Sequence, residues 1–215
     1  MDELELLKKD WKNKEKDLPK LSYNEIYNML WKRSSSLVKW IFYISIFEFV
    51  LYVALPFIFP GFYKNQAEQM EQLHVKLFSD IITYSAYVVL IFFMGWFFYN
   101  YKRISATDNV KQLMKTILNT RKSVRYYVFY NLVVVGLFAV IIFIAQVNYD
   151  PNIIQAIEKA NENGKATLFW VMIIGLMILT VVVMIGLMWL FYQLLYGILL
   201  RKLKKNYKEL EQIEI

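Results

Sequence analysis

The stretch that decides the fold is residues 37–59, LVKWIFYISIFEFVLYVALPFIF. A helix of this length can cross the hydrocarbon core of a bilayer, which requires about 20 apolar residues. Three further stretches share this character, namely residues 78–99, 126–147 and 168–200. Only helices and closed barrels satisfy their backbone polar groups in lipid, and the alternating pattern of barrel strands is absent. The sequence therefore predicts an all-α fold, a bundle of four transmembrane helices.

The composition divides the chain into three parts. Of the 215 residues, 58% are hydrophobic, and the excess over a soluble chain is concentrated in the four apolar stretches. We expect an N-terminal helical tail (1–36), a transmembrane domain (37–200) and a basic C-terminal helical extension (201–215). No small-residue cleavage site follows the first apolar stretch, so it should serve as an uncleaved signal anchor.

The basic residues predict the orientation of the bundle. Of the 25 Lys and Arg residues, 21 lie in residues 1–39, 101–125 and 201–215, which share one side of the predicted bundle. Basic residues favour the cytoplasmic side of a membrane, so we expect both termini in the cytoplasm. The net charge of +7 then serves orientation and contact with anionic lipid headgroups. It gives no reason to expect nucleic acid as a partner.

The N-terminal tail carries two helical signals. Leu4, Leu7 and Trp11 fall on one stripe of a helix. This stripe either lies on the bilayer or on the bundle, or it docks into the groove of a partner protein. Ser22 and Glu25 have the spacing of a capping box. A second helix should therefore begin directly after Ser22.

Two loops also carry helical patterns. Residues 110–118, on the predicted cytoplasmic side, have apolar side chains at i, i+3, i+4, i+7 and i+8. This pattern predicts an amphipathic helix on the inner leaflet. On the outer side, Asp150 can cap a helix that has Pro151 at its first position. A short amphipathic helix should begin there and pack against the outer ends of the bundle.

The fourth apolar helix should be the longest, continuing past the membrane to about Glu211. Gly175, Gly186 and Gly197 recur every eleven residues, a spacing that returns to within roughly 20° of one direction on a helix. We expect these glycines, and Gly136 on the third helix, to allow close helix packing within the bundle. Self-association into a homo-oligomer is the alternative use of this strip.

One ionisable side chain, Glu48, lies deep in a predicted span. A charge at the bilayer centre costs about 2.5–3.5 kcal/mol on insertion scales, so Glu48 should face the bundle and have a partner. Ser45 and Tyr52 share its helical face. Tyr87 and Thr180 lie at matching depth on other helices, and we expect one of them to hydrogen-bond with Glu48. Glu48 is then either a neutral residue that fixes helix register or a proton or cation site.

Motifs of common enzymes are absent. The sequence contains no P-loop, GxGxxG, HExxH or nucleophile elbow. It has a single histidine, His74, and no cysteine, which are too few for a multi-histidine or thiolate metal centre. We expect His74 to be solvated. The sequence therefore predicts no enzyme, no cofactor and no metal site.

The N-terminal region carries a family resemblance. Residues 2–40, DELELLKKDWKNKEKDLPKLSYNEIYNMLWKRSSSLVKW, resemble a functionally uncharacterised family of small four-helix membrane proteins of Bacteroidota bacteria. The resemblance lies in the Lys-Asp-Trp helix and the Ser-Tyr-Asn-Glu-Ile cap, and it implies four spans in a bacterial inner membrane. A charged helix on a membrane anchor is also similar to membrane-bound anti-sigma factors, although the His-Cys-Cys zinc signature of some of these is absent.

Two functional hypotheses follow from these features. The first is a non-enzymatic, multi-pass inner-membrane protein that anchors cytoplasmic helices for binding to another protein, for example as an anti-sigma-like regulator. The second is a small transport or channel component in which Glu48 binds a proton or a cation inside the membrane.

Overall fold

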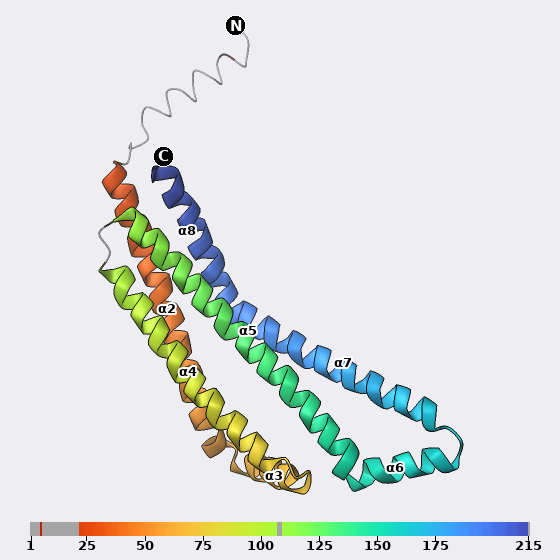
Figure 1. The fold of residues 1–215 in the computed structure, drawn as a ribbon. Coiled ribbons are helices and arrows are strands. Elements are labelled where there is room, and N and C mark those ends of the chain that lie inside the picture. Colours follow the sequence, from red (N-terminus) through yellow and green to blue (C-terminus); the bar gives the residue numbers. More distant parts are fainter. Residues whose placement is uncertain (1–4, 6–21, 107–108, 215) are drawn as a thin grey trace.

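The computed structural model describes residue 5, residues 22–106 and residues 109–214. Within these residues every element is a helix. In chain order the helices are α2 (Tyr23–Ile58), α3 (Pro60–Gln72), α4 (Lys76–Ser105), α5 (Val110–Tyr149), α6 (Pro151–Glu162), α7 (Ala166–Tyr192), the π-helix η1 (Gln193–Gly197) and α8 (Ile198–Glu214) (Figure 1). The predicted stripe of Leu4, Leu7 and Trp11 lies outside the described residues.

Four helical runs are long and apolar enough to cross a membrane. They are α2, α4, α5 and the continuous run of α7, η1 and α8. Each apolar stretch identified in the sequence lies largely within one of these runs. The fourth run continues well beyond its apolar stretch, as predicted. The expectation of four long apolar helices is therefore confirmed.

Both predicted helix caps are present. Ser22 Oγ accepts a hydrogen bond from the Glu25 backbone N–H at 3.3 Å, and the Glu25 carboxylate accepts one from the Ser22 N–H at 2.7 Å. Hydrogen bonds from the Ser22 backbone and hydroxyl hold the pKa of the exposed Glu25 carboxyl below its ordinary value. Asp150 Oδ1 accepts a hydrogen bond from the Asn152 N–H at 2.8 Å. These local bonds fix the starts of α2 and α6.

The helix predicted for residues 110–118 is not a separate surface helix. It is the first part of α5, a single helix of 40 residues. Val110, Leu113 and Ile117 are buried in the main core, where α5 packs against α4 and α8. No glycine or proline interrupts the chain between this segment and the next apolar stretch, so the helix continues. The prediction failed because an apolar stripe has the same period whether it faces lipid or other helices.

The bundle is tightly packed in one half and open in the other (Figure 1). The closed half, which contains the C-terminus, consists of residues 23–48, 93–105, 110–127 and 192–214. The splayed half consists of residues 49–92 and 128–191. The main core lies entirely in the closed half. Its fully buried apolar side chains are Val38, Ile41, Phe97, Ile104, Leu113, Ile117, Val124, Leu203 and Leu210.

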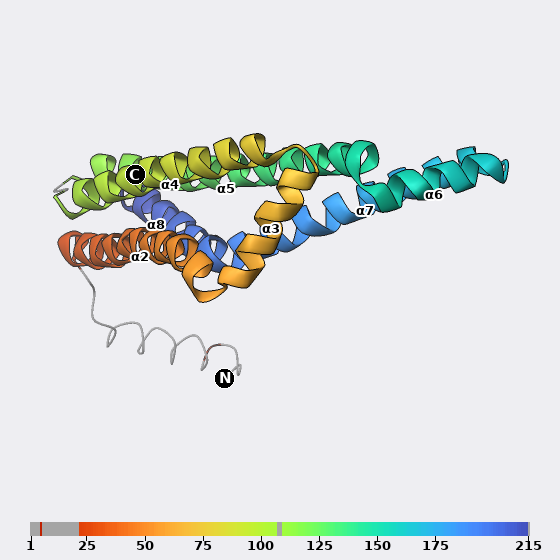
Figure 2. The ribbon, with the colours of Figure 1, turned by 90° about the horizontal axis from the view of Figure 1, so that it is seen from below.

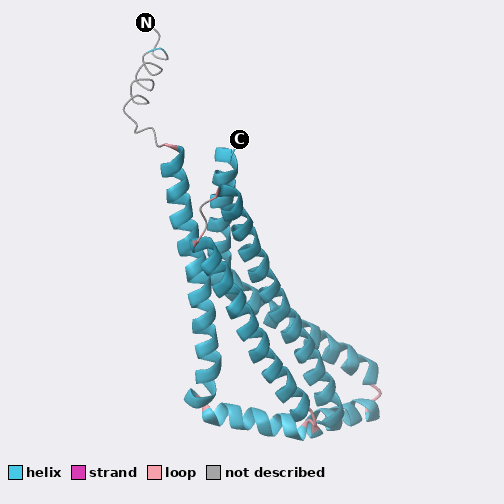
Figure 3. Ribbon diagram, turned by 60° about the vertical axis from the view of Figure 1, so that its left-hand side comes forward, coloured by secondary structure: helices cyan, strands magenta, loops and turns pink. Residues whose placement is uncertain are grey.

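In the splayed half, α7 diverges from α2 and α4 (Figures 1 and 3). It packs on α5, where a Cβ added at Gly136 would lie 3.2 Å from Ile185 Cδ1. Its one buried residue is Tyr192, the last residue of the helix. Large apolar side chains along its length are exposed by half or more; examples are Leu176, Leu179 and Leu187. α7 is therefore supported mainly along one side.

The two short helices, α3 and α6, connect the long helices at the end of the splayed half but do not fill the space between them. α3 crosses from the end of α2 to the start of α4 (Figure 2), and α6 joins α5 to α7 and has no buried residue. His74, in the turn before α4, is exposed as expected and has a left-handed backbone with φ 55°. Its ring packs edge-on against Tyr149 at 4.9 Å between centroids.

The glycines of the fourth run do not form the predicted packing strip within the chain. A Cβ at Gly175 or Gly186 would meet nothing within 4 Å among the described residues. At Gly197 it would lie 2.7 Å from Oε1 of Gln193, a side chain of the same helical run. The prediction failed because α7 diverges from the other helices and because the π turn of η1 changes the spacing along the helix.

Candidate functional site

The candidate site is built around Glu48, where the closed half meets the splayed half. Glu48 lies midway along the apolar stretch of α2 and is 5% exposed. Ser45, one turn earlier on the same face, is buried and donates its hydroxyl hydrogen bond to the Phe42 carbonyl at 2.7 Å. Tyr52, the third member of the predicted face, is 40% exposed. The predicted face is therefore buried at Ser45 and Glu48 and open at Tyr52.

Both carboxyl oxygens of Glu48 accept hydrogen bonds from tyrosines. Tyr192 Oη donates to Glu48 Oε1 at 3.1 Å, and Tyr196 Oη donates to Oε2 at 3.1 Å. Tyr192 ends α7 and Tyr196 lies in η1, and both side chains are buried. These bonds tie α2 to the fourth helical run at the point where α7 starts to diverge.

The prediction that Tyr87 or Thr180 would hydrogen-bond with Glu48 is wrong. Tyr87 Oη donates to the Tyr52 carbonyl at 3.4 Å, and Thr180 Oγ1 donates to the Leu176 carbonyl of its own helix at 2.9 Å. The prediction placed the middle of the fourth span by counting residues. Because α7 splays away, the residues that reach Glu48 lie more than about three turns further along the run.

Tyr127 of α5 completes a cluster of three buried tyrosines. Its ring packs edge to face on Tyr192 and Tyr196, with centroids 5.8 Å and 6.1 Å away. Its hydroxyl lies within interaction range of the Glu48 carboxyl and of the Tyr192 hydroxyl, although neither contact has well-formed hydrogen-bond geometry. A small rearrangement would therefore let Tyr127 join Tyr192 and Tyr196 as a hydrogen-bond donor to Glu48.

Sequence reasoning missed all three tyrosines. Tyr192 and Tyr196 are four residues apart in an apolar stretch, a spacing that puts two hydroxyls on one helical face. This spacing is a signal that could have identified the pair. Tyr127 has no comparable partner in its own helix, so its role is visible only once α5 is placed beside η1.

A π-helical turn lies at the tyrosine pair. Such turns are rare and often occur at functional sites. Gln193 begins η1 and Gly197 ends it. Because a Cβ at Gly197 would lie 2.7 Å from Gln193 Oε1, glycine at this position leaves room for the amide side chain. The turn therefore contains a polar side chain, Gln193, that directly follows Tyr192 of the cluster in the sequence.

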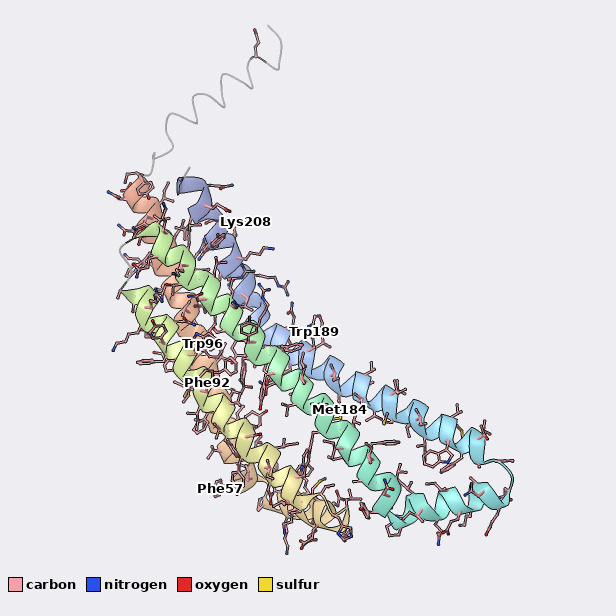
Figure 4. All side chains as sticks on the ribbon, viewed as in Figure 1. Phe57, Phe92, Trp96, Met184, Trp189 and Lys208 are labelled. Atoms are coloured by element: carbon pink, nitrogen blue, oxygen red, sulfur yellow. The ribbon has the colours of Figure 1, made fainter. Side chains whose placement is uncertain are left out.

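A groove leads from the tyrosine pair along the side of the bundle. This α5–η1 groove has a volume of about 450 Å³ and is lined by residues of α5, α7, η1 and α8. Tyr192 and Tyr196 line it together with Gln193, Trp189 and Arg125; Trp189 is labelled in Figure 4. The hydroxyl-bearing rings that hold Glu48 therefore also form part of a surface opening.

A second groove lies in the splayed half, between α5 and α7. This α5–α7 groove has a volume of about 520 Å³. Met184, labelled on α7 in Figure 4, is one of its mostly apolar lining side chains. Its polar lining side chains are Gln66, Gln146 and Thr180.

The cluster is suited to binding a proton. A tyrosine hydroxyl can both donate and accept a hydrogen bond. The same tyrosines can therefore stabilise Glu48 as a carboxylate or as a carboxylic acid. In the described part of the chain, no three His, Cys, Asp or Glu side chains are grouped so that they could hold a metal ion.

The chain belongs to the family described as Domain of unknown function (DUF8845), whose family model matches residues 24–215. No curated protein and no solved structure matches it. The matched segment includes all four long apolar runs except Tyr23, the first residue of α2, and it includes every residue of the Glu48 cluster. The family description names no activity.

Proposed function

We propose that the protein is a multi-pass protein of a bacterial inner membrane with both termini in the cytoplasm. Four long apolar helices support membrane insertion, as do the exposed apolar side chains that a bilayer would cover. The distribution of Lys and Arg supports the orientation, because all but Lys64, Lys76, Lys159 and Lys165 precede residue 40 or lie in the closed half. The closed half then faces the cytoplasm, and the splayed half occupies the outer leaflet.

Within this membrane protein, we propose that Glu48 is the proton-binding site of a small transport component. The observation that carries this proposal is the binding of both Glu48 carboxyl oxygens by buried tyrosine hydroxyls. Carboxyl groups inside a membrane are costly and commonly mark ion or proton pathways. The Tyr127 hydroxyl, which lies beside the carboxyl, gives the cluster a further group through which a proton can pass.

The two grooves supply polar groups on either side of the cluster. On the cytoplasmic side, Gln193 and Arg125 line the α5–η1 groove together with Tyr196. On the outer side, the α5–α7 groove contains Gln66 and Gln146. A proton relay needs more than one polar step across the membrane, and these side chains provide candidates for such steps.

Proton flux in liposomes tests this proposal. The purified protein is reconstituted around a pH-sensitive dye, and a potassium diffusion potential drives proton entry. We expect Glu48→Gln to lower the flux at least about tenfold, because the amide accepts hydrogen bonds but cannot release a proton at this pH. Glu68→Gln, which neutralises an exposed carboxylate on α3, is the matched control and should leave the flux unchanged. Equal flux from wild type and Glu48→Gln would refute the proton site.

A second function is favoured by the packing of the closed half. Its helices are joined by buried hydrogen bonds from Asn206 Nδ2 to Ser34 Oγ at 3.0 Å and from Asn100 Nδ2 to Ser123 Oγ at 3.2 Å. Such a rigid cytoplasmic platform suits a non-enzymatic protein that presents its N-terminal tail to a protein partner, as an anti-sigma-like regulator does. Within this alternative, Glu48 is a structural residue.

Photo-cross-linking in intact cells tests the platform. A photoreactive residue at position 4 should capture a defined partner, and Leu7→Ala with Trp11→Ala should abolish the capture. Lys9→Ala with Lys16→Ala is the control, because these positions lie on the face of the predicted tail helix opposite the stripe. Capture that survives the loss of both apolar side chains would exclude the predicted stripe as a partner-binding site.

A further inference from the structure

A third concave site lies on the closed half, between α2 and α8. This α2–α8 groove has a volume of about 480 Å³. The groove is lined by Arg33, Ser36 and Leu37 from α2 and by Lys202, Lys205 and Asn206 from α8. It shares no lining residue with the α5–η1 or the α5–α7 groove and does not include Glu48.

Three cationic side chains from two helices converge on this groove, and no carboxylate lines it. Lys205 Nζ lies 3.8 Å from Glu209 Oε1, a solvent-exposed pair within α8. Among the described residues, Arg33 and Lys202 form no ion pair. Like charges gathered in a concavity repel one another and focus a positive potential. The groove is therefore complementary to an anion.

The groove is also preorganised. Asn206 is 1% exposed and donates a hydrogen bond to Ser34 Oγ, which is fully buried, at 3.0 Å. This bond fixes the spacing of α2 and α8 directly behind the groove. Ser36 adds a hydroxyl donor to the lining. The backbones that carry the three cations and Ser36 are therefore fixed relative to one another before an anion binds, although the cationic side chains themselves are exposed.

The position of the groove identifies the source of the anion. Leu37, at one end of the lining, is the first residue of the apolar stretch of α2. On the cytoplasmic side of Leu37 lie Arg33 and Ser36, and on the membrane side the helix is mainly apolar beyond Lys39. A phosphate bound here would sit at headgroup level, with acyl chains free to lie along the apolar surface. Basic pockets between helices on this side of a membrane are suited to phosphate headgroups.

We propose that the α2–α8 groove is a specific binding site for the phosphate of an anionic inner-leaflet phospholipid. Arg33 and Lys202 bind the phosphate from opposite helices, Lys205 adds a third charge, and Ser36 donates a hydrogen bond. Arginine is well suited to this task because its planar guanidinium can bind two phosphate oxygens at once. The inference rests on the proposed membrane orientation and is independent of any transport by Glu48.

Native mass spectrometry of the full chain, titrated in detergent with phosphatidylglycerol or phosphatidylcholine, tests the site. We expect one phosphatidylglycerol to bind more tightly than the rest, with no such site for phosphatidylcholine. Arg33→Gln with Lys202→Gln should weaken that first site at least about tenfold. The control, Lys204→Gln with Lys208→Gln, also removes two positive charges, both from α8 outside the groove. It should change the affinity of the first site little. Equal weakening by the two double variants would overturn the proposal in favour of diffuse attraction.

Soluble competitors distinguish a lipid from a free phosphate compound. Inorganic phosphate and glycerol 1-phosphate should displace phosphatidylglycerol only at concentrations far above that of the lipid, because they lack the acyl chains. If either compound binds the groove as tightly as the lipid does, the lipid source is wrong. Thermal melts of each double variant verify that the bundle is intact, because neither variant alters Asn206 or Ser34. Since no proton flux is measured, failure here leaves the Glu48 proposal unaffected.

Discussion

The closed half and the splayed half are made from the same helical runs but are held together differently. In the closed half, fully buried apolar side chains are joined by buried hydrogen bonds such as that between Asn206 and Ser34. In the splayed half, the few buried apolar side chains are Met70, Leu73, Leu90 and Ala145. The fourth run contains the most apolar window of all, yet none of that window is buried. Hydrophobicity therefore indicates which segments can enter a membrane and does not indicate which segments pack together.

The difference also locates where the molecule can move. Local opening is drawn from regions with few buried contacts, and α7 is supported mainly by α5. The Glu48 cluster lies where α7 leaves the packed core, and its hydrogen bonds link α2 to the last residue of α7. We therefore expect a change in the protonation of Glu48 to be coupled to the angle of α7.

The largest expected effect comes from matched leucines in the two halves. Leu203 is fully buried in the closed half, whereas Leu187 of α7 is 63% exposed. Leu203→Ala should lower the free energy of unfolding by about 2–5 kcal/mol, because it leaves a cavity. Leu187→Ala should change it by less than about 1 kcal/mol, since no cavity forms. Denaturant unfolding of both variants in the same detergent measures this difference. Equal losses in the free energy of unfolding would contradict the contrast between the two halves.

The next effect lies at the junction of the halves. Tyr196→Phe keeps the buried ring but removes the hydrogen bond to Glu48 Oε2. We expect a loss of about 1–3 kcal/mol, because a buried carboxyl oxygen loses its donor. Tyr84→Phe removes a hydroxyl from a 70% exposed tyrosine of α4 and is the control. Thermal stability that falls by the same amount in both variants would show that the Glu48 bonds contribute nothing specific.

The smallest effect is at the start of α2, at the far end of the closed half. The pKa of Glu25 is lowered by its hydrogen bonds with Ser22, so the carboxylate stabilises the helix start at pH values above the ordinary glutamate pKa. This contribution should disappear as the pH falls through the lowered folded-state pKa. Amide protection in residues 23–26 should therefore decrease in acid for the wild type. Ser22→Ala should already have lower protection of these amides at neutral pH. Protection equal to that of the wild type at neutral pH would contradict a stabilising role of the cap.

Local and one-dimensional features of the fold could be predicted from the sequence. The capping residues Ser22 and Asp150 fix helix starts through bonds within a few residues, so their signals are complete in the sequence. The length of each apolar stretch likewise identified the four runs. Glu48 also stands out in the sequence, because an ionisable residue within an apolar stretch is evident without knowledge of its contacts.

The partners of Glu48 could not be predicted because they depend on three-dimensional placement. Matching residues by depth assumes parallel, upright helices, and the splay of α7 brings Tyr192 rather than Thr180 to the carboxyl. The prediction of a separate surface helix at residues 110–118 failed for a related reason. The periodicity of Leu113 and Ile117 does not show whether lipid or protein covers these side chains. Tilt, splay and the partner of an apolar face are properties of the whole bundle.

Infrared difference spectroscopy tests the central claim, that Glu48 exchanges a proton while held by Tyr192 and Tyr196. The protein in lipid is cycled between acidic and alkaline buffer, and the carboxylic acid C=O band is recorded. We predict a reversible band in the wild type that is missing from Glu48→Gln and shifted in frequency by Tyr192→Phe with Tyr196→Phe, because hydrogen bonding lowers the C=O stretch. Identical difference spectra for the wild type and Glu48→Gln would show that Glu48 does not change protonation, and the claim would be wrong.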